Sequence, residues 1–303
     1  MEPTALAALS ADLTALVERA APSVVRVEGR RRAAASGLVW SPDGVLVTAH
    51  HAVERDEEIE VGLPSGDTAV AEVVGRDPST DLAALRVRAS GLAAVDWPEA
   101  PAIGPGALVV GVTRPGRTPR AGLGVLARAS GEWRPPQGGR LDRWLETTLD
   151  LHRGLSGGLA VTAAGAPLGL LSAGLVRGTA MVVPAATLRR VVKSLLAHGE
   201  VRRGYLGVAT TPLSLPAALR AATGEEVALL VTAVEPDSPA DRAGLRFADA
   251  ILSFGGERLQ EPGALLGLLA EDRIGDAVVL RVLRGGDVLE VAVTIGTRDR
   301  RRT

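Results

Sequence analysis

The sequence has no cysteine, few aromatic residues and almost no net charge. Without cysteine no disulfide can form, so the fold must be stabilised by burial of its core, and the redox compartment cannot be inferred. Aromatic residues make up 2% of the chain, whereas it contains 36 glycines and 19 prolines, which favours short strands and turns around aliphatic cores. The formal net charge of −1 gives no electrostatic footprint, and we expect no nucleic-acid partner.

A long hydrophobic run is also missing. No stretch of about 18 uninterrupted apolar residues exists, so we expect no transmembrane helix. The chain opens Met-Glu-Pro-Thr without a basic segment, and Asp12 and Glu18 interrupt the early apolar stretch, which is unlike a secretory signal. These absences predict a cytoplasmic protein. We interpret the short arginine clusters at 31–32 and 300–302 as solvated charge.

The spacing of apolar residues divides the chain of 303 residues into several parts. Leucines three and four positions apart predict an N-terminal helix within residues 1–20. Two sets of six short apolar runs, at 24–87 and 107–183, are separated by turn signals and predict two β-lobes. A helix is expected from Pro184 to Gly199, because apolar residues repeat at helical spacing between them.

The last part of the chain reads as a separate α+β module. Strands are expected near 205–209, 228–234, 250–254, 278–283 and 288–295. Helices are expected at Pro216–Ala222 and Pro262–Leu269.

A serine lies between glycines at residues 153–158, Arg-Gly-Leu-Ser-Gly-Gly. Small residues beside Ser156 allow a sharp turn and the close approach of a substrate carbonyl. The same turn can direct the N–H groups of Gly154 and Ser156 at one point, which is the arrangement of an oxyanion hole. Taken alone, such a segment is more typical of a flexible loop.

A serine nucleophile needs a base and a carboxylate that orients the base. Of the four histidines, His198 lies at the end of a helix and His152 is too near Ser156 in the chain. The adjacent pair His50 and His51 therefore contains the candidate base. The candidate carboxylate is Asp81, at the entry to an apolar strand, where the alternative is a turn-capping aspartate.

The order of histidine, aspartate and serine is that of the chymotrypsin class, and the motifs resemble the HtrA/Deg family of serine proteases over residues 20–300. The segment VTAHHAV resembles the histidine motif of that family and points to His51 rather than His50. The segment GRDPSTDLAALRV is similar to its aspartate motif and points to Asp81, not Asp77. RGLSGG resembles its serine motif, and VVPAATLRRVV resembles the segment that closes its protease domain.

This resemblance implies a mainly β fold: two six-stranded antiparallel β-barrels of the chymotrypsin type, followed by a small α+β PDZ domain. The implied boundaries are a helix at 1–20, a trypsin-like protease domain at 21–199 divided near residue 98, and a PDZ domain at 203–298. Ser156 would be the nucleophile, His51 the general base and then acid, and Asp81 the residue that orients His51. The N–H groups of Gly154 and Ser156 would form the oxyanion hole. We expect no cofactor and no metal.

The sequence departs from the family around the serine. The usual asparagine before the serine and the usual proline after the second glycine are replaced by Leu155 and Leu159. If Leu155 relaxes the loop, one oxyanion donor is lost. We expect the substrate pocket to involve Asp150, Leu151 and Leu155, and two preferences remain open. Leu151 would favour aliphatic residues before the cut, whereas Asp150 would favour arginine or lysine.

The C-terminal module resembles protease-linked PDZ domains. The segment Gly204-Tyr205-Leu206-Gly207-Val208 is similar to their carboxylate-binding loop, with further resemblance at 234–240 and 242–245. A peptide C-terminus would add to the strand at Leu206–Ala209 by β-augmentation. The expected apolar pocket residues are Leu265, Leu266 and Leu269. At 247–249 Phe-Ala-Asp replaces the usual Pro-Gly-Asp.

Two functions are compatible with these motifs. The first is a bacterial, ATP-independent serine endopeptidase of protein quality control that cleaves unfolded polypeptides and binds peptide C-termini at its PDZ domain. The second is a degenerate protease that acts as a chaperone-like or peptide-binding protein. A homo-oligomer is also implied by the family, but residues 1–20 contain none of the aromatic residues that build its trimers.

Overall fold

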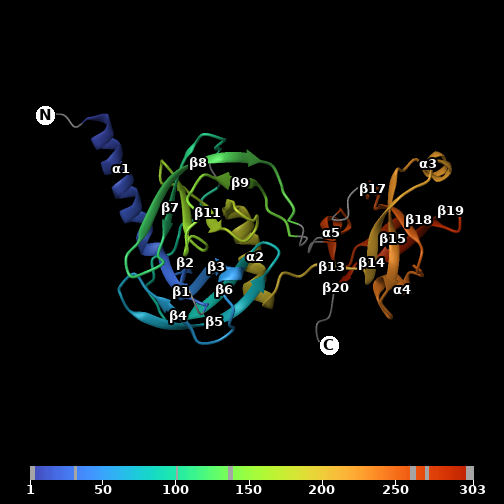
Figure 1. Cartoon of the computed structure of the whole chain (residues 1–303). Helices are drawn as coiled ribbons and strands as arrows, with labels where there is room; N and C mark the ends of the chain where they lie inside the picture. The colour runs from blue at the N-terminus through green and yellow to red at the C-terminus, as the bar shows by residue number, and fades with distance from the viewer. Residues whose placement is uncertain are drawn as a thin grey trace. The chain divides into compact units, whose positions relative to one another are not determined.

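The computed structural model describes residues 4–30, 33–99, 102–135, 139–259, 264–269 and 273–297. The arginine clusters at 31–32 and 300–302, residue 298 and the expected helix start at Pro262 lie outside these ranges. The chain divides into two compact units, Met1–Val201 and Arg202–Thr303 (Figure 1). The two units are described separately below.

Two closed β-barrels of six antiparallel strands make up most of the first unit, which confirms the predicted fold class. The first barrel has the strand order β1-β2-β3-β6-β5-β4. Its strands are β1 (Val24–Glu28), β2 (Ala35–Ser41), β3 (Val45–Ala49), β4 (Ile59–Gly62), β5 (Thr68–Asp77) and β6 (Leu82–Val87). The second barrel has the order β10-β11-β12-β9-β8-β7. Its strands are β7 (Leu108–Thr113), β8 (Arg120–Ser130), β9 (Trp144–Thr147), β10 (Leu159–Thr162), β11 (Pro167–Ser172) and β12 (Ala180–Pro184).

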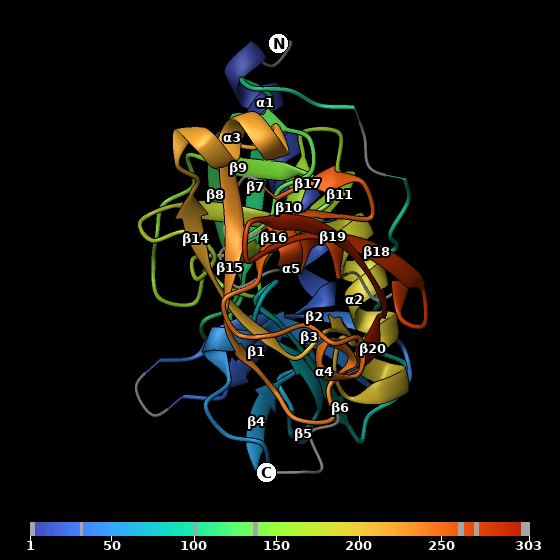
Figure 2. The same cartoon turned by 90° about the vertical axis from the view of Figure 1, so that its right-hand side faces the viewer.

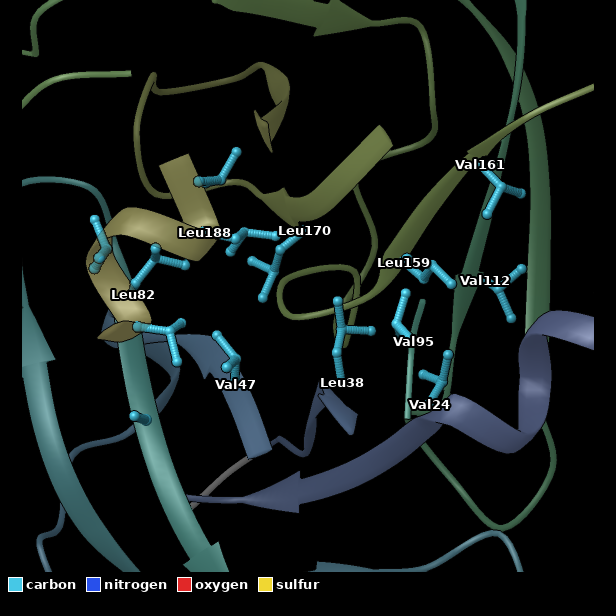
Figure 3. Packing of buried hydrophobic residues seen from close by; sticks show 14 of the residues in the cluster. Val24, Leu38, Val47, Leu82, Val95, Val112, Leu159, Val161, Leu170 and Leu188 are labelled. Carbon is cyan, nitrogen blue, oxygen red and sulfur yellow. The ribbon is translucent and has the colours of Figure 1, made fainter. Parts of the chain in front are cut away.

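Several strands are apolar on both faces because both faces are buried. Successive side chains of a strand point to opposite faces, so neighbours in the sequence enter different cores. Leu38 packs between the two barrels, whereas Val39 lies inside the first barrel. In the second barrel, Leu170 likewise packs between the barrels, whereas Leu171 lies inside the barrel. Figure 3 shows the shared core, where residues from both barrels meet. This core fixes one barrel against the other and so positions the loops at their junction.

Two helices accompany the barrels. Helix α1 (Ala5–Ala20) begins at Thr4, whose hydroxyl caps the Ala7 N–H, and it extends away from the barrels (Figure 1 and Figure 2). Its C-terminal half is anchored by the buried Leu16, whereas Leu6 near its start is 79% exposed. The short 3-10 helix η1 (Ala21–Ser23) leads from α1 into β1. Helix α2 (Ala185–His198) packs beside β5, β6 and β11.

The end of α2 shows why a glycine follows it. Gly199 has φ +75° and caps the helix by donating its N–H to the Leu195 carbonyl. Only glycine adopts this left-handed conformation without a steric penalty from Cβ. The predicted helix end is therefore explained by local geometry.

The second unit has a sheet with the strand order β14-β15-β16-β18-β19 and a separate two-stranded pair, β13 with β20. The strands are β13 (Gly204–Tyr205), β14 (Val208–Ser214), β15 (Val227–Val234), β16 (Ala250–Phe254), β17 (Glu257–Arg258), β18 (Ala277–Arg284), β19 (Asp287–Thr294) and β20 (Gly296–Thr297). The helices are α3 (Ala217–Thr223), α4 (Pro239–Arg242) and α5 (Ala264–Leu268). Strand β14 pairs with β15 alone, so one of its edges carries no strand of the described chain.

Three expected strands are bounded differently in the structure. The strand expected at 205–209 is interrupted, because Gly207 has φ +82° and separates β13 from β14. The apolar run at 145–151 predicts a strand that continues to Leu151, whereas β9 ends at Thr147. The apolar run at 167–175 predicts a strand that continues to Leu175, whereas β11 ends at Ser172. The Ser172 hydroxyl donates to Asp81.

A buried ion pair in the second unit makes its stability depend on pH. Asp249 is 1% exposed and accepts two hydrogen bonds from Arg284, at 2.7 and 2.8 Å. Burial acts to raise the pKa of Asp249, but the hydrogen bonds from Arg284 and from the Arg246 N–H outweigh it and lower the pKa. The carboxylate therefore contributes stability that is present above its unfolded pKa of about 3.9 and is lost as pH falls through the lower folded value.

We expect Asp249→Asn to destabilise the second unit at pH 7 by about 2 kcal/mol, because it removes the charge-assisted hydrogen bonds between Arg284 and the buried carboxylate. Thermal unfolding of the full chain at pH 7 and below pH 4 measures this. The unaltered chain should lose stability in acid, and the variant should show a smaller acid loss. Equal stability of the two chains at pH 7 would contradict a stabilising role for this pair.

Candidate active site

His51 and Asp81 form a hydrogen-bonded pair at one end of the first barrel. The 3-10 helix η2 (His50–Ala52) follows β3 and carries His51, and Asp81 directly precedes β6. The His51 Nδ1 lies 2.7 and 2.8 Å from the two carboxylate oxygens of Asp81. The Asp81 side chain also accepts the His51 backbone N–H at 3.0 Å. With Nδ1 engaged, Nε2 is the ring nitrogen that remains for proton transfer.

Asp81 is held in a strained backbone conformation. Its φ of +58° lies in the left-handed region, which a residue with a side chain occupies only when its surroundings enforce it. The His50 N–H donates to the Asp81 carbonyl at 3.0 Å, and the Ser172 hydroxyl donates to its carboxylate at 2.5 Å. The turn-capping role that was the alternative for Asp81 belongs to Asp77, which accepts hydrogen bonds from Ser79 and Thr80. Strain and hydrogen bonding thus orient Asp81 toward the histidine.

Ser156 lies shortly before β10, a strand of the second barrel. The segment that follows β11 contacts both Ser156 and the His51–Asp81 pair. In this segment Ala173 donates its N–H to Ser156 Oγ at 3.2 Å. Gly174 lies so close to the pair that an added Cβ would be 2.3 Å from His51 Nδ1. Among the described residues no hydrogen bond joins the His51 ring to the Ser156 hydroxyl, and such bonds often tighten only when substrate binds. The segment 172–174 therefore brings the three residues of the predicted triad to one place.

The loop before Ser156 contains the two N–H groups predicted to form an oxyanion hole. The Leu155 N–H donates to the His152 carbonyl at 3.1 Å, which closes a turn with Arg153 and Gly154 at its centre. Gly154 has φ +89° and Arg153 does not have a positive φ, so the turn is of type II. Within the described chain, neither the Gly154 nor the Ser156 N–H donates to another protein group. Both donors remain available for a substrate oxygen.

Leu155 is buried rather than lining a pocket. Its side chain is 2% exposed and packs in the core of the second barrel with Leu149 and Leu171. Where the family has asparagine, this chain therefore has a buried apolar side chain that attaches the loop to the core of the second barrel.

We expect Leu155→Ala to lower the free energy of unfolding of the first unit by about 2–5 kcal/mol, because it leaves a cavity in a packed core. Denaturant unfolding of the full chain measures this loss. The matched control is Leu151→Ala, because Leu151 is 43% exposed and its loss should change stability by less than about 0.5 kcal/mol. Equal effects of the two variants would show that Leu155 does not anchor the loop.

The remaining expected pocket residues are exposed. Asp150 has a side chain that is 80% exposed and lies 3.5 Å from Arg120. The nearby His152 ring lies 2.8 Å from the Arg153 carbonyl. Arg120 on β8 was not foreseen as a partner, because its proximity depends on the pairing of distant strands.

The other histidine of the adjacent pair has no comparable partner. Burial lowers the pKa of His50, and the charge of Arg76 lowers it further. The His50 Nδ1 is buried without a hydrogen-bond partner among the described residues. His51 is thus the member of the pair that faces a carboxylate. No group of three or more His, Asp or Glu side chains in the described ranges is placed to hold a metal ion.

The predicted peptide-binding residues of the second unit lie around the start of β14. Gly207 accepts the Glu235 N–H through its carbonyl, and the Leu206 carbonyl accepts the Ala240 N–H. The N–H groups of Leu206 and Gly207 donate to no other group of the described chain. These two donors lie next to the open edge of β14, beside Val208, and follow directly on Gly204 and Tyr205 of β13.

The three leucines of α5 and its end differ in exposure. Leu265 and Leu269 are buried in the core of the unit, whereas Leu266 is 49% exposed. Leu206 is also buried in this core. At residues 247–249, Phe-Ala-Asp replaces the Pro-Gly-Asp of the family. Ala248 has φ +67°, so this turn has a left-handed residue at the position of the usual glycine.

Comparison with known proteins identifies both units. Residues 35–170 match the model of a trypsin-like peptidase domain, and residues 204–295 match that of a PDZ domain. The chain is 32% identical over 270 residues to a probable periplasmic serine endoprotease, DegP-like, of Brucella suis, which covers 86% of this chain and 52% of the relative. It is 29% identical over 277 residues to a protein of the same description from Chlamydia trachomatis, covering 89% and 55%. The chain thus spans about half the length of the curated relatives it matches.

Solved structures agree with this assignment. A serine endoprotease from Yersinia pestis superimposes with a TM-score of 0.75 at 26% identity, covering 99% of this chain and 100% of that chain. The HtrA-type protease AlgW with a decapeptide superimposes with a TM-score of 0.74 at 25% identity, covering 94% and 98%. Fold, site and matches define a trypsin-like peptidase domain followed by one PDZ domain. Over both units the chain is similar to serine endoproteases described as DegP-like or HtrA-type.

One expectation from the sequence is wrong. The prediction of a cytoplasmic protein is contradicted by the relatives, which are named as periplasmic endoproteases. Composition and the first residues of the chain do not carry that information. Within the described part of the chain, no helix is both long enough and apolar enough to cross a bilayer.

Proposed function

We propose that the chain is a serine endopeptidase that uses His51, Asp81 and Ser156. His51 Nε2 takes the proton of the Ser156 hydroxyl as Oγ attacks the scissile carbonyl, and then gives that proton to the leaving amine. Asp81 holds the His51 tautomer and stabilises the imidazolium. Water then attacks the acyl-enzyme, with His51 again as base, and releases the second product. The observation that carries this proposal is the His51–Asp81 hydrogen bond of 2.7 Å. The segment 172–174 lies against this pair and also contacts the Ser156 hydroxyl.

As Ser156 attacks, negative charge develops on the oxygen of the substrate carbonyl. The N–H groups of Gly154 and Ser156 would stabilise this charge. Donors held in place before the reaction are worth more than mobile ones, because they need no reorganisation as charge develops. The type II turn around Gly154 and the buried anchor Leu155 support this role. No observation on the described residues favours the degenerate alternative.

We propose that the enzyme cuts after aliphatic residues rather than after arginine or lysine. The charge of Asp150 is turned toward solvent and lies near Arg120, which weakens its attraction for a basic substrate side chain. Leu151 offers exposed apolar surface in the same segment. Mass-spectrometric mapping of the peptides released from unfolded casein tests this preference. Predominant cuts after arginine or lysine would assign the pocket to Asp150 instead.

We propose that the second unit binds peptide C-termini by β-augmentation on β14. The free N–H groups of Leu206 and Gly207 would take the terminal carboxylate, and the open edge of β14 would pair with the peptide backbone. Leu266, exposed on α5, would contact the terminal side chain, and the buried Leu265 and Leu269 would hold α5 in place. Fluorescence anisotropy with a labelled peptide and its C-terminally amidated form tests this. Equal binding of the two forms would exclude carboxylate recognition.

The biological setting follows from the relatives. We propose a bacterial protease of the periplasm that degrades unfolded polypeptides as part of protein quality control, in keeping with the names of the curated relatives. Unfolded polypeptides suit the site because an extended chain reaches a buried serine more easily than a folded one. The expected homo-oligomer stays a prediction.

A further inference from the structure

We propose that Ser36 is a positioning residue that holds the oxyanion loop in its active orientation. This inference rests on the proposed peptidase function. Ser36 lies in β2 of the first barrel, 120 positions before the nucleophile. It is 0% exposed, so water does not compete for its hydrogen bonds.

Ser36 binds the carbonyls of both residues that supply the oxyanion donors. Its hydroxyl donates to the Gly154 carbonyl at 2.7 Å. Its own N–H donates to the Ser156 carbonyl at 3.0 Å. One residue of the first barrel therefore fixes two peptide groups of the second barrel, on either side of the buried Leu155.

The direction of the Ser36 hydroxyl is itself fixed. The Arg114 backbone N–H donates to Ser36 Oγ at 2.8 Å, which leaves the hydroxyl hydrogen for the Gly154 carbonyl. The Ser36 carbonyl accepts the Thr48 hydroxyl at 2.6 Å. An added Cβ on Gly157 would lie 1.8 Å from the Ser36 carbonyl, so the loop lies directly against β2. Every polar group of Ser36 is thus engaged, and the contact is close.

Arg114 anchors the other side of this connection. Its guanidinium is buried and donates to the carbonyls of Val24 at 2.6 Å and Ala21 at 2.9 Å. Arg114 follows β7 of the second barrel, whereas Val24 begins β1 of the first. These bonds cross the junction of the barrels and restrain Arg114, whose backbone N–H orients the Ser36 hydroxyl.

The loop needs such a restraint because glycine does not supply one. Gly154 has no side chain to limit its dihedral angles, and a rotation of the Arg153–Gly154 peptide would convert the type II turn to type I and turn the Gly154 N–H away. The hydrogen bond from Ser36 to the Gly154 carbonyl fixes the next peptide group and opposes this rotation. Loss of the hydroxyl would leave the donor present but free to turn away.

The test compares Ser36→Ala with Ser194→Ala in full-length protein. Ser194 is also buried and donates its hydroxyl to a backbone carbonyl, that of Glu200 at 3.0 Å, but it lies on α2. We expect Ser36→Ala to lower kcat for casein cleavage by about 10- to 100-fold, less than the 10²–10³-fold loss when an oxyanion donor is removed outright. KM and binding of a C-terminal peptide should not change. The rate of labelling by a fluorophosphonate should fall by the same factor as kcat, and Ser194→Ala should keep the kcat of the unaltered chain.

The outcomes separate this proposal from the proposed function. An unaltered chain that neither cleaves casein nor reacts with the probe would contradict the peptidase function itself. An active unaltered chain with a Ser36→Ala variant as fast as Ser194→Ala would overturn the role of Ser36. If Ser36→Ala does not fold, Ser36→Cys replaces the hydroxyl with a weak donor of similar shape. We expect a lower kcat there too, and an unchanged kcat would equally overturn the proposal.

Discussion

Replacing Ser156 by alanine is expected to lower kcat for the hydrolysis of unfolded casein by about 10⁶-fold. Without the hydroxyl, no acyl-enzyme can form, and the His51–Asp81 pair has no nucleophile to activate. The remaining rate would come from binding and from the oxyanion donors alone. The release of labelled peptides from casein measures this loss.

The control for this variant is Ser130→Ala, because Ser130 is exposed at the end of β8 and outside the site. Its kcat should equal that of the unaltered chain. Circular dichroism of both variants should show the same fold. A Ser156→Ala variant that keeps more than about a hundredth of the activity would show that another group is the nucleophile.

Replacing Asp81 by asparagine is expected to lower kcat by about 10⁴-fold while the fold is retained. The asparagine amide can donate to His51 Nδ1, which favours the tautomer with its proton on Nε2. That tautomer cannot take the proton of Ser156. The amide also cannot stabilise the imidazolium that forms during the reaction. Steady-state cleavage of a peptide identified from the casein map measures this effect.

Asp142→Asn is the matched control for this second variant. Asp142 also accepts a hydroxyl hydrogen bond, from Thr187 at 2.7 Å, but it does not touch His51. Its replacement should change kcat by less than threefold. If Asp81→Asn and Asp142→Asn have equal kcat values, Asp81 does not orient the base.

The barrels could be predicted because their sequence pattern has a direct physical cause. Runs such as those of β3 and β11 are apolar at consecutive positions, since one face lines a barrel and the other the core between the barrels. Turn residues such as Gly44, with φ +98°, separate the strands and mark their ends. The apolar runs and the turn residues are both local features, so both can be recognised in the sequence without the tertiary structure.

The distinction between His50 and His51 cannot be made from local sequence features. His50 and His51 are adjacent, and the residues alone did not distinguish them before the family resemblance was considered. The structure does so because the chain turns in η2 and presents His51 to Asp81, 30 positions away. The interpretation of Leu155 as a pocket residue failed for a related reason, since its side chain packs into the barrel core instead.

Two further serines received no role from the sequence, although Ser36 opens the segment Ser36-Gly37-Leu38-Val39, which resembles the family's lead-in to its histidine. Ser172 contacts Asp81 across 91 positions, and Ser36 contacts Gly154 across 118 positions. The residue types beside Ser36 and Ser172 do not by themselves indicate a role for either hydroxyl. A hydroxyl gains such a role only through the residue that the fold places beside it, so no local pattern could indicate it.

The most direct measurement of the central claim is the reaction of the folded chain with a fluorophosphonate, followed by peptide mass spectrometry. A hydroxyl activated by a histidine base reacts with this probe, whereas an ordinary serine does not. We predict a single adduct on Ser156, absent in Ser156→Ala and formed much more slowly in Asp81→Asn. A folded chain that carries no adduct, or one on a different residue, would contradict the convergence of His51, Asp81 and Ser156 into a working triad.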